Sequence, residues 1–398
     1  MHLSRDSARC LFCALLALLL AAGWLSLTVR CNDQGNWSAL FMTGGNLPLP
    51  AGPDFRGTYL FPGSNGYDGQ SYRVIAHDPG LRRGLWIDSP RLRYRRILLP
   101  ALAYAFALGA PGRVDGAYIA VQLGFLFLGV YWAARWAALH GRSPAWGLCF
   151  LALPATLVSL DRMTPDLPLA ALCCAWALYR SGADIPVCGV GARDGIRPLV
   201  FLALAPFARE TGLLLVAAAA LAEAGARRFR RALWTLAAAV PYAVWCIYAW
   251  MRTPPDATNL FARLPFSGIA AALFHGLPEP RGAFRPALIA LDYAALAGMV
   301  LAMVLAAWLW LRNRRDPIAI AALLFALLAV QATHPEIWAH VFSFGRVFSP
   351  LLLLLALSAA RKAARHRALL LAPVILMLPR VAAQFAPQAF GVLRGLLG

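Results

Sequence analysis

The chain has 398 residues, of which 60% are hydrophobic and 14% are charged, whereas a soluble domain carries about 45–50% apolar and about 25% charged residues. This composition excludes an ordinary soluble fold and predicts a single membrane domain over residues 1–398. The formal net charge of +19 lies in short basic clusters between apolar runs, which is typical of membrane topology signals, so we expect no nucleic acid partner.

The first apolar run, residues 11–29, follows Arg5 and Arg9. It resembles a signal peptide, but it is long and lacks a convincing small-residue cleavage site. We therefore predict an uncleaved anchor with the N-terminus in the cytoplasm, followed by a first large outer loop over residues 30–114. This loop is rich in Gly, Pro, Asn and Asp, which predicts turns and short helices.

The apolar segment 97–108 decides the topology of everything after it. It is shorter than the about 20 residues that cross a bilayer, so we predict that it lies in the membrane interface. The later basic clusters then all fall on the cytoplasmic side, as the positive-inside rule requires. These clusters are Arg135 with Arg142, Arg180 with Arg193 and Arg197, and the runs 227–231, 312–315 and 361–367.

The fold class that follows is an all-α polytopic membrane protein with about eleven transmembrane helices. The predicted spans are 11–29, 115–138, 144–160, 166–180, 197–208, 211–226, 231–250, 287–311, 317–333, 347–360 and 367–386. Besides the first loop, the outer segments are the tips at 161–166 and 209–210, a second larger loop over 251–286, and the loop 334–346.

The densest polar segment of the chain lies in the first loop, at residues 66–73. Its glycines permit tight turns, so the carboxylate of Asp68 could be presented from a loop at the membrane surface. A partly desolvated carboxylate there can act as a general base toward a hydroxyl group. The alternative is that Asp68 only caps a helix that starts near Gln70.

A basic stretch follows in the same loop, with Arg82, Arg83, Arg91, Arg93, Arg95 and Arg96. Guanidinium groups suit phosphate oxygens, so an anionic lipid phosphate is a natural partner. Contact with the headgroups of ordinary membrane lipids is the other interpretation, and both can hold together.

Charged residues also stand at two outer tips, Asp161, Arg162 and Asp166 at one and Arg209 with Glu210 at the other. Charges between apolar segments are expected to face a cavity or a partner rather than lipid. Arg209 could pair with Glu210 or with Asp166, and Asp166 could instead cap the helix that it precedes.

The last outer loop contains His334, Glu336 and His340, followed by Arg346. Two His and one Glu are zinc-ligand types, but their spacing matches no standard zinc motif, so they are weak metal candidates. Arg346 stands at the start of a span and could bind a phosphate or extend to the interface.

These segments resemble the GT-C superfamily of integral membrane glycosyltransferases, and within it the bacterial cell-surface glycopolymer proteins with a YDGQ-type first loop. The likeness is clearest over about the first 170 residues, with a weaker echo at 209–211. The residues that carry it are Gly35-Asn36-Trp37-Ser38-Ala39-Leu40, Gly66-Tyr67-Asp68-Gly69-Gln70, Asp78-Pro79, Arg93-Tyr94-Arg95-Arg96-Ile97-Leu98-Leu99-Pro100, the segment 100–109 as a juxtamembrane helix, and Thr164-Pro165-Asp166.

The resemblance implies transfer of a sugar from a polyprenyl-phosphate donor to a glycan or lipid acceptor, on the periplasmic side of the bacterial inner membrane. Asp68 would match the catalytic base, Asp166 an accessory acidic residue and Arg346 a ligand of the donor phosphate. The candidate binding residues are Tyr67, Gln70, Arg73, Arg95, Arg96, Arg209, Glu210 and Arg346. No cofactor is required, but a divalent metal stays open because one Asp stands where some relatives carry an acidic pair.

Two other functions fit the same sequence. One is a transporter or flippase for a lipid-linked glycan, although its charged residues would be expected within the spans, whereas here they lie mostly at span ends and in loops. The other is a non-catalytic subunit of a glycan assembly complex, because large outer loops also bind partners.

Overall fold

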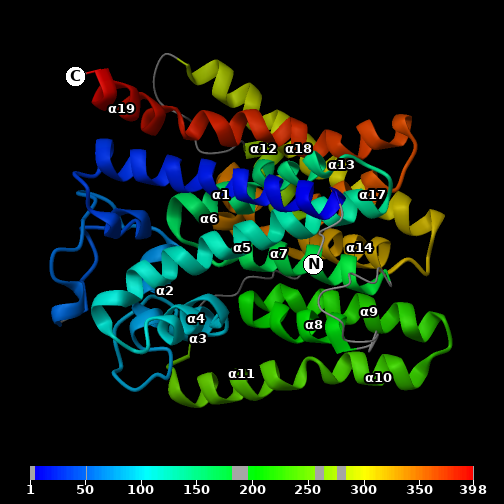
Figure 1. The fold of residues 1–398 in the computed structure, drawn as a ribbon, viewed down its shortest axis with the longest axis horizontal. Helices are drawn as coiled ribbons and strands as arrows, with labels where there is room; N and C mark the ends of the chain where they lie inside the picture. Colours follow the sequence, from blue (N-terminus) through cyan, green and yellow to red (C-terminus); the bar gives the residue numbers. More distant parts are fainter. Residues whose placement is uncertain (1–4, 51, 182–195, 256–263, 276–283, 398) are drawn as a thin grey trace.

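The computed structural model describes residues 5–50, 52–181, 196–255, 264–275 and 284–397 (Figure 1). Every regular element in these ranges is a helix, and the only β-type pairing among them is an isolated bridge between Gly44 and Phe61. Several of the helices are apolar and long, so the chain is an all-α membrane protein, as predicted.

Five helical stretches in the described residues are long and apolar enough to cross a membrane. They are α1 (Arg5–Asn32), α5 (Pro111–Leu139), α10 with α11 (Phe229–Ala237 and Val240–Arg252), α13 (Arg285–Arg312) and α18 (Ala364–Gln384). Two bent pairs would raise the number to seven: η3 with α6 (Pro144–Ala152 and Pro154–Arg162, bent by 61°) and α16 with α17 (Val341–Val347 and Ser349–Ala360, bent by 58°).

The remaining predicted spans contain shorter helices. They are α7 (Asp166–Arg180), α8 (Ile196–Ala208), α9 (Leu213–Gly225) and α14 (Pro317–Gln331). With 13 to 15 residues each, they measure about 20–23 Å, less than the about 30 Å of a hydrocarbon core. Each of the eleven predicted segments therefore holds a helix or a bent pair, while the number of crossings stays a prediction.

The segment predicted to lie in the interface forms α4 (Leu98–Phe106), whose nine residues are too few to cross a bilayer. It packs against α5 and against α2 (Asp68–His77). The first loop therefore holds several short helices, with η1 (Trp37–Phe41), η2 (Pro53–Phe55) and α3 (Pro90–Tyr94) in addition to α2 and α4.

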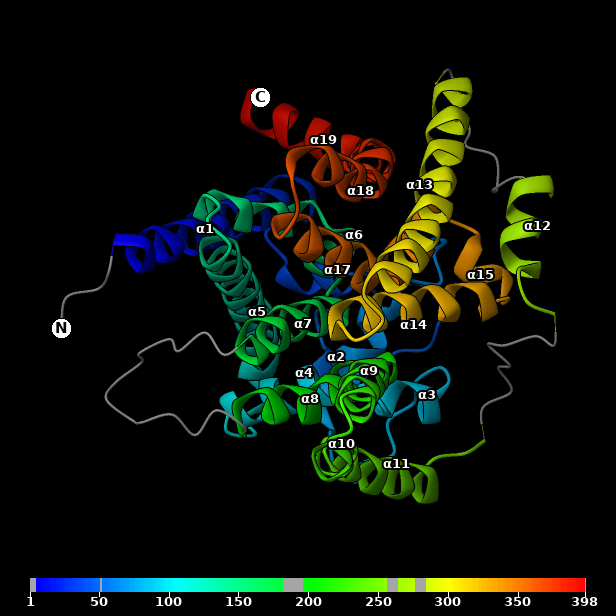
Figure 2. The ribbon, with the colours of Figure 1, turned by 90° about the vertical axis from the view of Figure 1, so that its right-hand side faces the viewer.

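The helices α7 and α17 lie in the middle of the bundle (Figure 2). Every residue of α17 is buried, and the indole of Trp136 on α5 donates a hydrogen bond to the carbonyl of Leu357 at 2.9 Å. Both helices are apolar on all sides, which allows them to be surrounded by protein in the core of the bundle.

The basic turns between helices gather at one end of the bundle, to the right in Figure 1. Contacts tie them to one another and to the start of α1: Arg142 to the carbonyls of Ala360 (3.1 Å) and Lys362 (2.9 Å), Arg361 to Asp316 (2.8 Å), Arg180 to Glu223 (3.2 Å) and Arg135 to Ser7 (2.6 Å). We call this the basic end. Its composition is the one that the positive-inside rule anticipates for a single face of the membrane.

The first loop packs at the opposite end around an aromatic core, in which the buried rings of Phe41, Tyr72 and Tyr94 from the loop meet that of Tyr118 from α5. The C-terminal helix α19 (Ala386–Leu397) packs against α1, and Asn32 donates to the carbonyl of Gln388 at 3.1 Å. The loop 251–286 contains α12 (Ser267–His275) and lies partly outside the described residues. The loop 334–346 forms α15 (Pro335–Trp338) and most of α16.

Candidate active site

A cavity of about 270 Å³ lies at the end of the bundle opposite the basic end. Its polar wall comes from segments far apart in the sequence: the start of α2, residues 88–96, the short helix η4 (Glu210–Gly212), residues 334–336 and α16. Four arginines reach it, Arg93, Arg96, Arg209 and Arg346, and so do the carboxylates of Asp68, Asp88, Glu210 and Glu336. We call it the acid–arginine cavity.

Asp68 is the first residue of α2, and the N-cap position before it belongs to Tyr67. One carboxylate oxygen lies 2.8 Å from Nη1 of Arg93, and the other lies 2.8 Å from Nη2 of Arg346. The positive end of the helix also favours a carboxylate at this position. Asp68 is therefore held by two guanidinium groups at the cavity wall and is not a helix cap.

The turn before α2 fixes where Asp68 points. The amide of Tyr67 donates to the carbonyl of Met42 at 2.9 Å, and the side chain of Gln70 bridges the amide of Gly44 and the carbonyl of Asn65. Gly66 has φ of +76°, a conformation that other residues rarely adopt. Gln70 thus ties the turn to η1 and does not reach the acid–arginine cavity.

Gly69 lies against the end of α6, where a Cβ atom would sit 2.1 Å from the carbonyl oxygen of Arg162. Since backbone cannot yield as a flexible side chain does, Gly69→Ala is expected to push α2 away and to lower the free energy of unfolding by about 1–3 kcal/mol. Thermal unfolding in detergent measures this. The matched control is Gly116→Ala within α5, where nothing lies within 4 Å and the stability should stay or rise. Equal stability of the two variants would contradict this packing.

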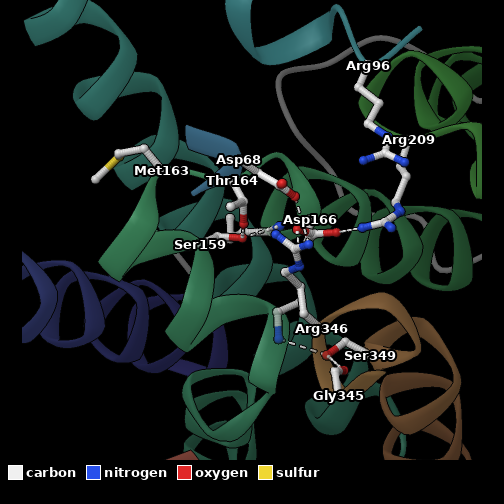
Figure 3. A network of polar contacts seen from close by, with 12 residues as sticks. Asp68, Arg96, Ser159, Met163, Thr164, Asp166, Arg209, Gly345, Arg346 and Ser349 are labelled. Carbon is white, nitrogen blue, oxygen red and sulfur yellow. Dashed lines mark hydrogen bonds and ion pairs between the residues drawn. The ribbon is translucent and has the colours of Figure 1, made fainter. Parts of the chain in front are cut away.

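Asp166 is the first residue of α7 and is 3% exposed. Its carboxylate forms an ion pair with Arg209 and lies 3.4 Å from Nε of Arg346 (Figure 3). The segment before it is fixed by a hydrogen bond of 3.0 Å between the hydroxyls of Ser159 and Thr164. Arg346 therefore joins Asp166 to Asp68 and points inward, not toward the membrane interface.

Glu210 forms a bidentate ion pair with Arg96, in which Nε donates to Oε2 at 2.8 Å and Nη2 donates to Oε1 at 2.7 Å. Arg96 also donates to the phenol oxygen of Tyr72 at 3.0 Å. Arg209 therefore takes Asp166 as its partner, and the neighbouring Glu210 takes Arg96. A bidentate contact between a guanidinium and a carboxylate fixes the orientation of both groups, so this pair holds η4 against the first loop.

The electrostatics of the cavity favour ionised groups. Burial raises the pKa of the Asp68 carboxyl, but the guanidinium groups of Arg93 and Arg346 outweigh burial and hold that pKa well below its usual range. Several buried donors still have no hydrogen-bond partner, namely Nε of Arg93, Nε of Arg209 and Nη1 of Arg346. Buried donors without partners are unfavourable, so the arrangement is suited to receive the oxygens of an anion.

The pair of Glu210 and Arg96 makes the stability depend on pH. Burial raises the pKa of Glu210, but Arg96 outweighs burial and brings the pKa to about 2. Because the folded-state pKa is depressed, the carboxylate stabilises the fold above its unfolded-state pKa, and this stabilisation, on the order of 3 kcal/mol, is lost as pH falls toward about 2.

Glu210→Gln is therefore expected to be less stable than the unmodified chain at neutral pH, and the difference should shrink as pH falls from about 4.5 toward about 2. Thermal unfolding in detergent across this pH range measures the difference. A difference that stays constant with pH would show that Glu210 does not titrate in this way.

Tyr67 separates the acid–arginine cavity from a smaller neighbouring cavity of about 180 Å³ and lines both. The guanidinium of Arg162 lies 4.5 Å from the centre of the Tyr67 ring on one side, and that of Arg346 lies 5.1 Å from it. His340 lines the smaller cavity, whereas His334 and Glu336 line the larger one. In the described part of the chain no three His, Cys, Asp or Glu side chains form a group that could hold a metal.

Besides Gln70, the structure places two more of the expected binding residues outside the acid–arginine cavity. Arg73 is buried beneath the first loop, where it donates to Asp115 at 2.7 Å and to the hydroxyl of Thr58 at 2.7 Å. Its partner Asp115 lies near the start of α5, so Arg73 connects the loop to the bundle. Arg95 does not line the cavity and lies near Tyr242 of α11. Along a helical turn Arg95 faces away from Arg93 and Arg96.

Arg93 and Asp88 are the residues of the cavity that the sequence analysis did not place in it. Arg93 bridges Asp68 and Asp88, with 2.6 Å to the latter, and Ser71 donates to the other oxygen of Asp88. The spacing of Arg93 and Arg96, three residues apart, is a signal that could have found Arg93, because a helical turn brings such residues to the same side.

Comparisons of the chain with family models, with curated proteins and with solved structures give no match. What the site can do is therefore inferred from its own residues and geometry.

Proposed function

We propose that the chain is a GT-C-type membrane glycosyltransferase that moves a sugar from a polyprenyl-phosphate donor to a glycan or lipid acceptor. The observation that carries this proposal is the convergence of Asp68 with Arg93 and Arg346 at the wall of the acid–arginine cavity. A single displacement needs one base and a stabilised phosphate leaving group, and this cavity supplies both kinds of side chain.

In the proposed reaction the acceptor oxygen attacks the anomeric carbon of the donor sugar. The bond from that carbon to the phosphate oxygen breaks, and the polyprenyl phosphate leaves with the bonding electron pair. The proton of the acceptor hydroxyl passes to Asp68. Arg346 and Arg209 hold the developing charge of the phosphate through their buried N–H donors that make no other hydrogen bond with the described residues.

Asp68 is a weak base while two guanidinium groups hold its oxygens. A phosphate that binds Arg346 or Arg93 competes for the same N–H groups and weakens the hold on Asp68. The pKa of Asp68 then rises toward the range in which a carboxylate accepts a proton from a hydroxyl group. Binding of the donor thus prepares the base.

The proposed topology has about eleven crossings, with the N-terminus in the cytoplasm of a bacterium and the cavity on the periplasmic side of the inner membrane. The arginines of the basic end favour this orientation. The start of α1 lies at the basic end, and the far end of α1 contacts the C-terminal helix α19. The two ends of the chain therefore lie at opposite ends of the bundle, as expected for an odd number of crossings. A divalent metal is not part of the proposal.

The charge distribution favours catalysis over transport. The paired charges lie at the first residues of α2 and α7 and in η4, at one end of the bundle. A transporter would be expected to hold them near the bilayer midplane. Purified protein in detergent micelles separates these functions, because transport needs two compartments. We expect it to transfer labelled sugar from a polyprenyl-phosphate donor, and folded protein without such transfer would contradict the proposal.

A further inference from the structure

A larger cavity, of about 590 Å³, lies at the basic end of the bundle between α7, α8, α9 and α10. It is separate from the acid–arginine cavity. The helix α7 runs from Asp166, the partner of two arginines of that cavity, to Arg180 at the inner cavity, a distance of about 21 Å along the helix. We call it the inner cavity.

The walls of the inner cavity are amphipathic. Trp176, Leu199, Leu202 and Trp234 supply apolar surface, and Arg180, Arg228, Arg231 and Glu223 supply charge. An occupant that matches both kinds of wall has an anionic part and an apolar part.

Among the described residues, the charges that line the inner cavity do not balance. Glu223 lies 3.2 Å from Arg180 and 3.9 Å from Arg228, so its one negative charge serves two cations. Arg231 makes no ion pair with a described residue. The indole N–H of the fully buried Trp176 also has no hydrogen-bond partner. Excess positive charge beside an unpaired buried donor points to an anionic ligand.

The apolar side of the inner cavity continues toward the bilayer. On α10, Trp234 is 62% exposed, and it also lines the cavity. A volume of about 590 Å³ lies in the size range of ligand sites. Basic pockets between transmembrane helices on the cytoplasmic side are known to take anionic lipid headgroups.

We propose that the inner cavity binds one anionic phospholipid, with its phosphate at Arg228 and Arg231 and its acyl chains against Leu199 and Trp234. This site lies outside the proposed glycosyltransferase chemistry and does not depend on it. The bound lipid would fasten α10 to the pair α8 and α9 at the basic end.

Native mass spectrometry of the full chain in detergent, titrated with dioleoylphosphatidylglycerol or dioleoylphosphatidylcholine, tests the proposal. We expect one tightly bound phosphatidylglycerol, held at least about tenfold more tightly than phosphatidylcholine. Arg228→Gln with Arg231→Gln should weaken it by about tenfold or more. The matched control, Arg314→Gln with Arg315→Gln, removes two charges from another turn of the basic end and should leave the affinity within about threefold.

Leu199→Trp fills the inner cavity without changing its charge, and it should weaken phosphatidylglycerol binding about as much as the double Arg variant does. Unchanged phosphatidylglycerol binding in Leu199→Trp would overturn the proposal. An equal loss of affinity in the control pair would also overturn it, and would indicate general attraction of anionic lipid to the basic surface. Full competition by inorganic phosphate would indicate a free-anion site instead.

Discussion

Asp68→Asn is expected to lower the rate of sugar transfer by about 10²–10⁴-fold while the protein stays folded. Asn has nearly the shape of Asp but cannot accept the proton of the acceptor hydroxyl. The fold should survive because each guanidinium keeps another carboxylate: Arg93 keeps Asp88 at 2.6 Å, and Arg346 keeps Asp166 at 3.4 Å. Initial rates with purified protein and a labelled polyprenyl-phosphate sugar measure the change.

Asp88→Asn is the matched control for this prediction. Asp88 binds the same Arg93 but its side chain is 42% exposed and belongs to the rim of the cavity. Its removal should change the rate by less than about tenfold, as expected for an exposed ion pair. Comparable losses in Asp88→Asn and Asp68→Asn would mean that the position of Arg93 matters and that Asp68 is not the base.

Arg346→Gln is expected to impair both stability and transfer. It removes a side chain that contacts both Asp68 and Asp166, and among the ion pairs of described residues it leaves the buried Asp166 only the pair with Arg209. Loss of one partner of a buried pair costs about 3–5 kcal/mol, and loss of a group that stabilises the leaving phosphate lowers kcat/KM by about 10²–10³-fold. Thermal unfolding in detergent and transfer rates at saturating and limiting donor measure the two effects.

The basic end offers a matched control for Arg346→Gln. Arg361 lies 2.8 Å from Asp316, the same distance as that between Arg346 and Asp68, but its side chain is 33% exposed. Arg361→Gln should cost at most about 1 kcal/mol and leave transfer unchanged. If both variants behaved alike, Arg346 would be an ordinary ion-pair residue without a part in donor binding.

The helices could be predicted well from the sequence because long apolar runs are a local signal. The predicted segment 166–180 coincides with α7, and 197–208 with α8 to within a residue. The bends were not predicted. Pro154 and Pro350 stand at the first turns of α6 and α17, where a Pro starts a helix easily but cannot continue a preceding one, so each long apolar run divides into two helices.

The site could be predicted only in part, because its contacts join residues far apart along the chain. The sequence analysis placed Asp68, Asp166, Arg209 and Arg346 in candidate positions, but Asp68 and Arg346 are 278 residues apart. Which of several arginines faces the cavity depends on the helical phase of a five-residue helix, α3, that no periodic pattern announces. For the same reason the sequence predicts Arg95 as a binding residue, whereas Arg93 lines the cavity.

Arg73 illustrates a second limit. It follows the YDGQ segment closely, and in sequence it is as plausible a ligand as any other Arg of the loop. Its actual partner, Asp115, lies 42 residues later near the start of α5, and the contact is partly buried. A buried Arg–Asp pair that holds a loop on a bundle and one that binds substrate have the same residue types, so only the fold separates them.

The central claim is that the donor phosphate binds at Arg346, beside Asp68. A cryo-electron microscopy structure of Asp68→Asn with a bound polyprenyl-phosphate sugar tests it most directly, because this variant should hold the donor without consuming it. We predict phosphate density within hydrogen-bonding distance of the Arg346 guanidinium, with the anomeric carbon facing residue 68. Donor density in any other cavity, with Arg346 still paired only to Asp166, would contradict the claim.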